Sequence, residues 1–252
     1  ICKQMAKRGY VAANINYRLG WNPLSTDENV RRGTLLQAVY RSLHDVQTAV
    51  RFLRSPAGAP FGIDPAKFAL IGQGSGGYVT QAYATLNNYN TEIAGLPKFI
   101  DTGTGLPFVI ESRDGTIDGG PGFLRLHDPL FDFGFPKNVS MSVNMGGSLA
   151  DSTWLEQDDA AMVAFHCLRD PFAPFDHGMV VVPTTNENVV PVDGGNIFIR
   201  KANEFGNNDA FSGIPDGNPY TDAARATYGQ TYGYIYATQP TMTVSEGAEG
   251  LY

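Results

Sequence analysis

The sequence predicts an α/β fold built on a parallel sheet, and three observations support this fold class. An apolar run at 10–17 precedes a long amphipathic stretch at 35–53. A second apolar run at 68–73 leads through a glycine-dense hinge into another amphipathic stretch. Further apolar runs follow at 139–144 and 160–166. Strands and helices that alternate with crossovers of this length are typical of parallel strands joined by right-handed connections.

The first elements are defined by glycines and by apolar spacing. Residues 1–8 are expected to end a helix that Gly9 closes. Residues 10–17 are expected to form a buried strand, because parallel strands are apolar for most of their length. A polar loop follows over 21–33. The stretch 35–53 should be a helix, since its apolar residues recur at helical spacing. These residues are Leu36, Val39, Tyr40, Leu43, Val46, Val50 and Leu53.

The later elements follow the same logic. We expect the helix after the hinge to extend to about Leu86, and the runs at 139–144 and 160–166 to be strands. Residues 178–192 are typical of a small hairpin around 184–188, and the helix at 196–205 should end at Gly206.

Two segments lack such patterns. The excursion at 87–138 is rich in Gly, Asp, Pro and Asn, and a loop of this length is usually functional or a lid. Its run Asp114–Gly120 superficially resembles a calcium loop, but it lacks the regular acidic spacing and the terminal Glu, so we expect a surface loop and no metal. The tail at 207–252 is polar and rich in Tyr and Gly, and only 232–237 is strand-like.

Composition limits the classes of function. The 252 residues suffice for a single domain over 1–252. The net charge of −7 argues against a nucleic-acid partner, and no apolar run is long enough to span a membrane. The chain begins at Ile1 without a signal peptide, so we expect a part of a longer protein. Few lysines with many Asn, Thr, Gly and Tyr favour an extracellular or cell-surface location.

The cysteines are too few for a disulfide framework. Cys2 and Cys167 match no zinc motif in their spacing. One bond between them is possible, and two buried thiols are the alternative that we favour.

The hinge Gly72-Gln73-Gly74-Ser75-Gly76 is the most informative stretch. A strand that turns this sharply into a helix, written G-x-S-x-G, is the nucleophile elbow of α/β-hydrolases. Here glycine stands at the position of the nucleophile.

Three further motifs precede the hinge, and their order and spacing along the chain are as informative as the motifs themselves. They are Asn16–Gly20, Asp45–Leu53 and Phe61–Pro65, and the hinge motif itself continues to Gly77. Together the four resemble the carboxylesterase, or esterase-like, branch of the α/β-hydrolase superfamily, closely over 8–85 and more loosely over 139–205. The resemblance implies an α/β-hydrolase fold, with a mostly parallel sheet, helices on both faces and an insertion over 87–138 that caps the active site. The first strands of that fold would precede Ile1.

Acyl transfer on this fold needs a nucleophile, a histidine, an acid and an oxyanion hole. Gly74 has no side chain. Ser75 is a fallback nucleophile, but a one-residue step along a helix rotates its side chain by roughly 100°; the other interpretation is a residue that satisfies free N–H groups at the helix start. The N–H groups of Ser75 and Gly76 are the oxyanion-like donors.

The resemblance places the triad acid at Asp170, in a segment where His166 also matches and Cys167 and Ala173 depart. Asp170 is therefore a relict acid or a capping residue before Pro171. We expect Asp45 to be structural and to pair with Arg18.

The resemblance implies one more strand and a loop with the catalytic histidine after the helix at 196–205, and no histidine occurs there. The four histidines are His44, His127, His166 and His177. We interpret His166 as a hydrogen-bonded interior residue and His44 as a surface or core residue, while His177 is close enough in sequence to Asp170 to reach the pocket.

These observations favour a catalytically degenerate esterase-like domain without a cofactor, which binds protein partners or neighbouring domains of a larger secreted protein. The alternative is an active serine carboxylesterase that uses Ser75 and Asp170 with a histidine outside this segment. A third hypothesis is an assembly subunit that docks through its aromatic tail. The tyrosines of that tail are Tyr220, Tyr228, Tyr232, Tyr234 and Tyr236.

Overall fold

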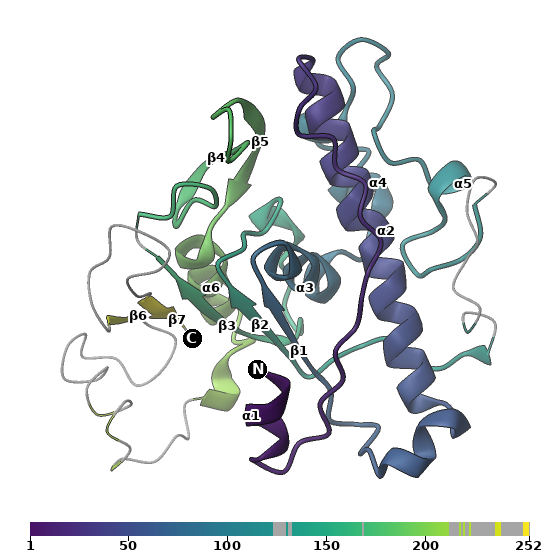
Figure 1. The fold of residues 1–252 in the computed structure, drawn as a ribbon, viewed down its shortest axis with the longest axis vertical. Coiled ribbons are helices and arrows are strands. Elements are labelled where there is room, and N and C mark those ends of the chain that lie inside the picture. The colour runs from purple at the N-terminus through teal and green to yellow at the C-terminus, as the bar shows by residue number, and fades with distance from the viewer. Residues whose placement is uncertain are drawn as a thin grey trace.

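The computed structural model describes residues 1–122, 130, 133–167, 169–211, 217, 219, 222, 235–237 and 249–251. The described part is a mixed α/β structure around a five-stranded sheet of order β1-β2-β3-β7-β6 (Figure 1). Besides the α-helices and strands described below, the structure has short 3-10 helices at Pro56–Phe61, Pro97–Phe99, Ser152–Trp154 and Asp209–Phe211.

Three parallel strands form the part of the sheet that carries the hinge. β1 (Ala69–Gln73) pairs with β2 (Met141–Met145), and β2 pairs with β3 (Ala161–His166). The short strands β7 (Glu249–Leu251) and β6 (Ile235–Ala237) add antiparallel pairings. The predicted strands at 68–73, 139–144 and 160–166 are therefore confirmed, and the parallel arrangement holds for these three.

The helix α2 (Glu28–Arg54) is the longest element. It begins seven residues before the predicted start at Leu35, because the Asp27 side chain accepts a hydrogen bond from the Asn29 N–H at 2.8 Å and caps the helix. The predicted apolar stripe packs into the core, where Tyr40 and Leu43 are buried.

The helices α3 (Ser75–Thr85) and α6 (Gly195–Glu204) share one face of the sheet. Ser142 accepts a hydrogen bond from Gln81 of α3, and its register partner Met162 packs in the same core as Phe198 of α6. Side chains alternate along a strand, so Phe165, three residues beyond Met162, faces the other way, and it is 45% exposed. We expected helices on both faces; among the described residues, the three long helices that contribute to the core, α2, α3 and α6, lie on one.

The described part of the insertion packs on α2 (Figure 1). It contains α4 (Tyr89–Glu92) and α5 (Glu111–Asp114). Polar side chains of α2 bind its backbone carbonyls: Tyr40 donates to Gly115 at 2.8 Å, and Gln47 donates to Ile117 at 2.7 Å. These bonds give the insertion a structural role on α2, and capping of the elbow stays a prediction.

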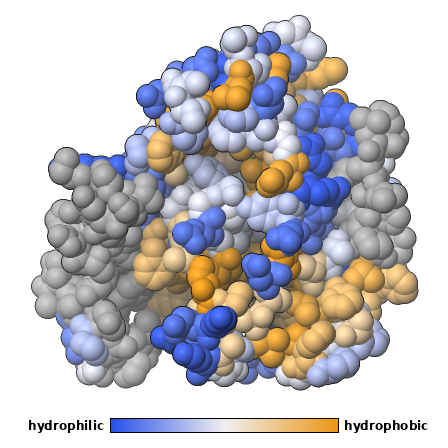
Figure 2. All heavy atoms as spheres, in the orientation of Figure 1, coloured by the Kyte–Doolittle hydropathy of each residue, from blue (hydrophilic) through white to orange (hydrophobic). Residues whose placement is uncertain are grey.

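The predicted strand at 10–17 is wrong. After the short helix α1 (Cys2–Ala6), this segment has no strand pairing, and Tyr10 is 65% exposed. Figure 2 shows hydrophobic residues on the lower part of the visible face, where this segment runs in Figure 1. A strand needs a ladder of hydrogen bonds to a neighbour, and an apolar sequence alone does not supply one. The turn after it is held as expected, because the Arg18 guanidinium lies 2.6 Å from the Asp45 carboxylate.

The predicted hairpin is confirmed as β4 (His177–Val181) and β5 (Asn188–Asp193), which pair antiparallel around a small cluster of valines. The predicted end of α6 is also confirmed, since Gly206 follows it with a φ of 80°.

No disulfide bond joins Cys2 and Cys167. Cys167 is buried, as we expected, while Cys2 is only half-buried. Among the helices that the structure describes, none is long and apolar enough to cross a membrane. Within the described ranges, no three acidic, histidine or cysteine side chains are grouped so that they could hold a metal ion.

Candidate functional site

The hinge between β1 and α3 consists of a single residue, Gly74. Its φ of 55° and ψ of −118° lie in a region that favours glycine. A Cβ atom built on Gly74 would meet no heavy atom within 4 Å. The conformation, and not a lack of space, therefore favours glycine here, and any other residue at this position would be strained by its backbone.

The flanking glycines are required for a different reason. A Cβ atom on Gly72 would lie 2.0 Å from the Gly76 carbonyl oxygen, and one on Gly77 would lie 2.2 Å from Asn144 Oδ1. At Gly72 the strand β1 meets α3, and at Gly77 the helix meets β2, with no room for a side chain, as predicted for this hinge.

Asn144 fixes the loop that follows β2 against this hinge. Its side chain is fully buried; Oδ1 accepts from the Gly147 N–H at 2.8 Å, and Nδ2 donates to the Gly147 carbonyl at 2.7 Å. The Met145 carbonyl in turn accepts from the Gly74 N–H at 2.9 Å. We did not predict a role for Asn144 from the sequence, although a polar residue near the end of a buried strand, with two glycines after Met145, is a usable signal.

Ser75 is the first residue of α3 and is exposed. Its Oγ lies 2.8 Å from the Tyr17 hydroxyl. We expected this side chain to satisfy free backbone N–H groups; the observed hydrogen bond is with Tyr17 instead. The N–H groups of Ser75 and Gly76 have no acceptor within the helix, because the first turn of an α-helix offers none. They are available as donors at the positive end of the helix dipole.

Asp170 lies at the same edge of the sheet as the hinge. Its side chain is only 4% exposed, and a Cβ atom on Gly146 would lie 3.9 Å from its Oδ2. Its Oδ1 accepts from the N–H groups of Phe172 and Ala173, both at 2.9 Å. These bonds match the capping interpretation, and a past catalytic role stays a prediction.

His166 is a buried, hydrogen-bonded interior residue, as predicted. Its Nε2 lies 2.8 Å from the Ala173 carbonyl oxygen and 3.9 Å from Asp170 Oδ2, which is beyond hydrogen-bond distance. Burial lowers the pKa of His166 and outweighs the opposing effects of the Ala173 carbonyl and the Asp170 charge. The imidazole is therefore neutral at pH 7.

A tyrosine hydroxyl is also among the polar groups near Asp170. Tyr78, on the first turn of α3, has a buried hydroxyl group that hydrogen-bonds with Ser148. Burial raises the pKa of Tyr78, and the negative charge of Asp170 raises it further. A phenol with a raised pKa stays protonated at neutral pH, so it does not serve as a general base.

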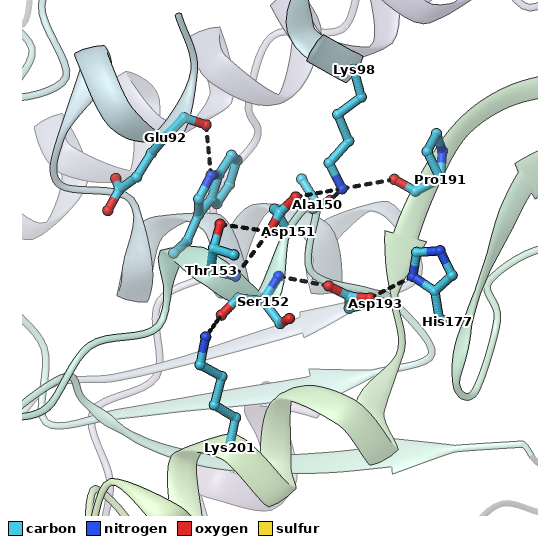
Figure 3. Close-up of polar contacts among 11 residues, drawn as sticks. Glu92, Lys98, Ala150, Asp151, Ser152, Thr153, His177, Pro191, Asp193 and Lys201 are labelled. Carbon is cyan, nitrogen blue, oxygen red and sulfur yellow. Dashed lines mark hydrogen bonds and ion pairs between the residues drawn. The ribbon is translucent and has the colours of Figure 1, made fainter. Parts of the chain in front are cut away.

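His177 pairs with another acid. Its Nδ1 lies 2.8 Å from Asp193 Oδ1, and its side chain is 68% exposed (Figure 3). Asp193 Oδ2 accepts from the Ser152 N–H at 2.7 Å. Burial raises the pKa of Asp193, but the hydrogen bonds from His177 and Ser152 outweigh burial and lower it. The pair thus links the first residue of β4 to the last residue of β5 at the base of the hairpin. The expectation that His177 serves Asp170 is not supported by these contacts.

Two lysines complete the network around Asp193. Lys98 Nζ lies 2.8 Å from Asp151 Oδ2 and donates to the Ala150 and Pro191 carbonyls, while Lys201 donates to the Ser152 carbonyl (Figure 3). The network ties together the insertion, the loop after β2, β5 and α6.

His44 is buried in α2, with its Nε2 2.7 Å from the Thr116 carbonyl oxygen. It is thus a core residue, one of the two outcomes that we expected. His127 lies outside the described residues.

The first part of the chain is similar to a known protein family. Residues 1–104 match the BD-FAE family model. This is a domain of the α/β-hydrolase and esterase type, and the match covers the hinge and α3. No curated protein and no solved structure matches the chain. The family match supports an esterase-like hydrolase domain for 104 of the 252 residues.

Proposed function

We propose that this chain is a catalytically degenerate esterase-like α/β-hydrolase domain with a binding, structural or assembly role in a larger secreted or cell-surface protein. The observation that carries the proposal is Gly74. The hinge has the backbone of a strand-to-helix elbow and open space above it, yet the residue at its apex has no side chain. Without an oxygen at this position, no acyl intermediate forms there.

The described histidines add support. His44 and His166 are buried against backbone carbonyls, and His177 is hydrogen-bonded to Asp193. General-base catalysis needs an imidazole within hydrogen-bond reach of the nucleophile. The described part of the chain shows no histidine in contact with Ser75, whose observed partner is Tyr17.

The second candidate is an active serine carboxylesterase that uses Ser75 and Asp170 with a histidine from outside this segment. One observation favours it: Ser75 is exposed beside the free N–H groups at the start of α3. This candidate requires the Ser75 hydroxyl to leave Tyr17 and to accept a histidine partner.

Ester hydrolysis separates the two candidates. We expect the wild-type chain and Ser75→Ala to hydrolyse p-nitrophenyl acetate at equal rates, because a surface serine without a base contributes no catalysis. Tyr17→Phe, which removes the partner of Ser75 and leaves the rest of the hinge intact, should leave the rate unchanged as well. A wild-type rate that Ser75→Ala lowers a hundredfold or more would contradict the proposal, since loss of a working nucleophile costs several orders of magnitude.

The assembly role concerns the tail. Most of its tyrosines lie outside the described residues, and Tyr236 falls in β6. Sedimentation of the wild-type chain and of a chain truncated after Phe211 tests the role. We expect the truncation to reduce association with a neighbouring domain or partner while α2 and α3 keep their helical signal.

A further inference from the structure

The outer edge of β1 has no paired strand in the described part of the chain. β1 is the terminal strand of the sheet, and β2 is its neighbour. The Phe68 carbonyl accepts from the residue before β2 at 2.8 Å, and the Gly74 N–H donates to the last residue of β2 at 2.9 Å. Backbone groups of successive residues point to opposite edges of a strand, so those of Ala69, Ile71 and Gln73 point outward. Such an edge readily accepts another strand.

A second stretch of backbone also lacks a neighbour. Residues 11–16 are all exposed, and the described part of the chain shows no hydrogen bond to their backbone groups. The apolar residues Ala13 and Ile15 alternate with two asparagines, which is the period of a β-strand. The chain therefore carries both a strand-like segment and an open strand edge that could receive one.

Side-chain contacts fix the end of this segment without joining it to β1. The Tyr17 hydroxyl lies 2.8 Å from Ser75 Oγ at the start of α3, and the Arg18 guanidinium is bound to Asp45 of α2. Paired strands lie about 4.8 Å apart, and a tyrosine hydroxyl lies farther than this from its own backbone. The contact with α3 is thus made by the side chain, and the segment does not complete the sheet of its own chain.

The two stretches are also free of charge. No Asp, Glu, Lys or Arg occurs in residues 10–17 or in β1, although the chain has a net charge of −7. Tyr10 and Val11 are more than half exposed, and hydrophobic residues gather on the visible face where this segment runs (Figure 2). Two copies can therefore meet here without burying a charge. A second copy fits this surface because it brings a strand-like segment and an open edge of its own.

We propose that two copies of this chain form a two-fold dimer in which residues 11–16 of each copy add as a strand to the outer edge of β1 of the other copy. Each copy donates one segment and receives one, so the same contact occurs twice, as two-fold symmetry requires. Main-chain hydrogen bonds supply the affinity, and the alternating side chains set the register. The dimer needs no nucleophile, so it stands whether or not the hinge is catalytic.

Sedimentation of the wild-type chain at increasing concentration tests the dimer. We expect the mass of one chain when the protein is dilute and twice that mass when it is concentrated. Ala12→Pro combined with Ala13→Pro removes two adjacent N–H groups, one of which faces the neighbouring strand. This variant should raise the Kd of the dimer at least about tenfold. Its helical signal should be unchanged, because both residues are exposed and unpaired within one chain.

Leu19→Lys is the control variant. It removes an apolar side chain that is 81% exposed but lies outside the segment, and it should leave the Kd of the dimer unchanged. A wild-type chain that stays monomeric at every concentration would overturn the proposal, and so would an equal Kd for the wild type and the proline variant.

Amide hydrogen exchange on the wild-type chain locates the contact without a variant. In the concentrated protein, alternate N–H groups of residues 11–16 and those of Ile71 and Gln73 should exchange at least about tenfold more slowly than in the dilute protein. The Gly74 N–H, which already bonds to β2, is the internal control and should not change. A dimer in which residues 11–16 exchange as fast as in the monomer would place the contact elsewhere and contradict the proposal.

Discussion

Two polar regions of the molecule, the hinge around Gly74 and the base of the β4–β5 hairpin, are built from different interactions. The hinge around Gly74 is held by close backbone contacts and by the neutral amide of Asn144. The base of the β4–β5 hairpin is held by charged groups, with Asp193 bound to His177 and Asp151 bound to Lys98. One region is a glycine hinge between a strand and a helix, and the other contains a hydrogen-bonded acid–histidine pair.

The comparison indicates that the backbone geometry of the hinge does not depend on nearby groups that could transfer protons. The hinge glycines are needed for the chain to pass from β1 to α3, whether or not a reaction occurs there. The polar groups that would run a reaction belong to other hydrogen-bond systems: Asp170 caps its own loop, and His177 bonds with Asp193. The four predictions below test this comparison.

The largest effect is expected from Gly72→Ala. The new Cβ atom would lie 2.0 Å from the Gly76 carbonyl oxygen, so strand and helix must separate. We expect a loss of about 3 kcal/mol or more in the free energy of unfolding, measured by urea denaturation. Gly74→Ala is the matched control, with open space but a positive φ, and should cost only about 1–2 kcal/mol. Equal costs for the two variants would contradict this account of the hinge.

Asn144→Ala should have the next largest effect. It removes both hydrogen bonds to Gly147 and leaves a buried N–H group and a buried carbonyl without their partner. We expect a loss of about 2–4 kcal/mol in the free energy of unfolding, independent of salt concentration. Ser142→Ala, at a neighbouring buried position on the same strand, removes a hydroxyl that bonds to Gln81 and serves as a comparison. A marked salt dependence for Asn144→Ala would show that the hinge is not held by neutral contacts.

The hairpin base should respond to acid. The pKa values of Asp151 and Asp193 are both lowered: burial raises each, but the hydrogen bonds from Lys98 and Thr153 to Asp151, and from His177 and Ser152 to Asp193, outweigh it. A carboxylate with a lowered pKa in the folded state stabilises the fold above its unfolded pKa of about 3.9 and loses that contribution as pH falls. We expect a loss of about 1–2 kcal/mol between pH 5 and pH 2, measured by urea denaturation.

The acid experiment needs a control for Asp159, because protonation of Asp159 changes the free energy of unfolding in the opposite direction. Burial, together with the charges of Glu156 and Glu92, raises the pKa of Asp159 to about 7. Its folded form therefore binds a proton more tightly than its unfolded form, and its contribution to stability falls as pH rises from about 4 to 7. Asp159→Asn should remove this fall and leave the acid loss in place. An acid loss that persists in Asp193→Asn combined with Asp151→Asn would contradict the assignment.

The smallest effect is expected from His177→Ala. The imidazole is largely exposed, and exposed pairs contribute little. We expect a loss of less than about 1 kcal/mol in the free energy of unfolding and no change in ester hydrolysis. A large loss of hydrolysis in this variant would join the two regions into one active site and break the comparison.

The sequence was sufficient for elements that local patterns specify. The apolar stripe of α2, the glycine hinge before α3 and the turn residues of the β4–β5 hairpin each carry their own signal. The strand at 10–17 was wrong because a strand depends on a neighbour that supplies hydrogen bonds, and apolar residues do not report whether that neighbour is there.

The hydrogen-bonded side-chain pairs at the site could not be predicted from the sequence for a similar reason. His177 and Asp193 meet only because the hairpin register places them opposite each other, and Ser75 meets Tyr17 across 58 positions of sequence. Asp170 was the residue expected at the edge of the sheet, yet its hydrogen bonds with Phe172 and Ala173 depend on the loop conformation. Residue type and position singled out Asp170 and the histidines, while three-dimensional pairing decided which group each one binds.

The central claim is that the hinge has no working nucleophile, and a fluorophosphonate probe tests it most directly. The intact mass of the chain is measured after incubation with the probe, in parallel with Ser75→Ala. The account predicts an unmodified mass for both proteins. A stoichiometric adduct on Ser75 in the wild-type chain, absent from Ser75→Ala, would contradict it.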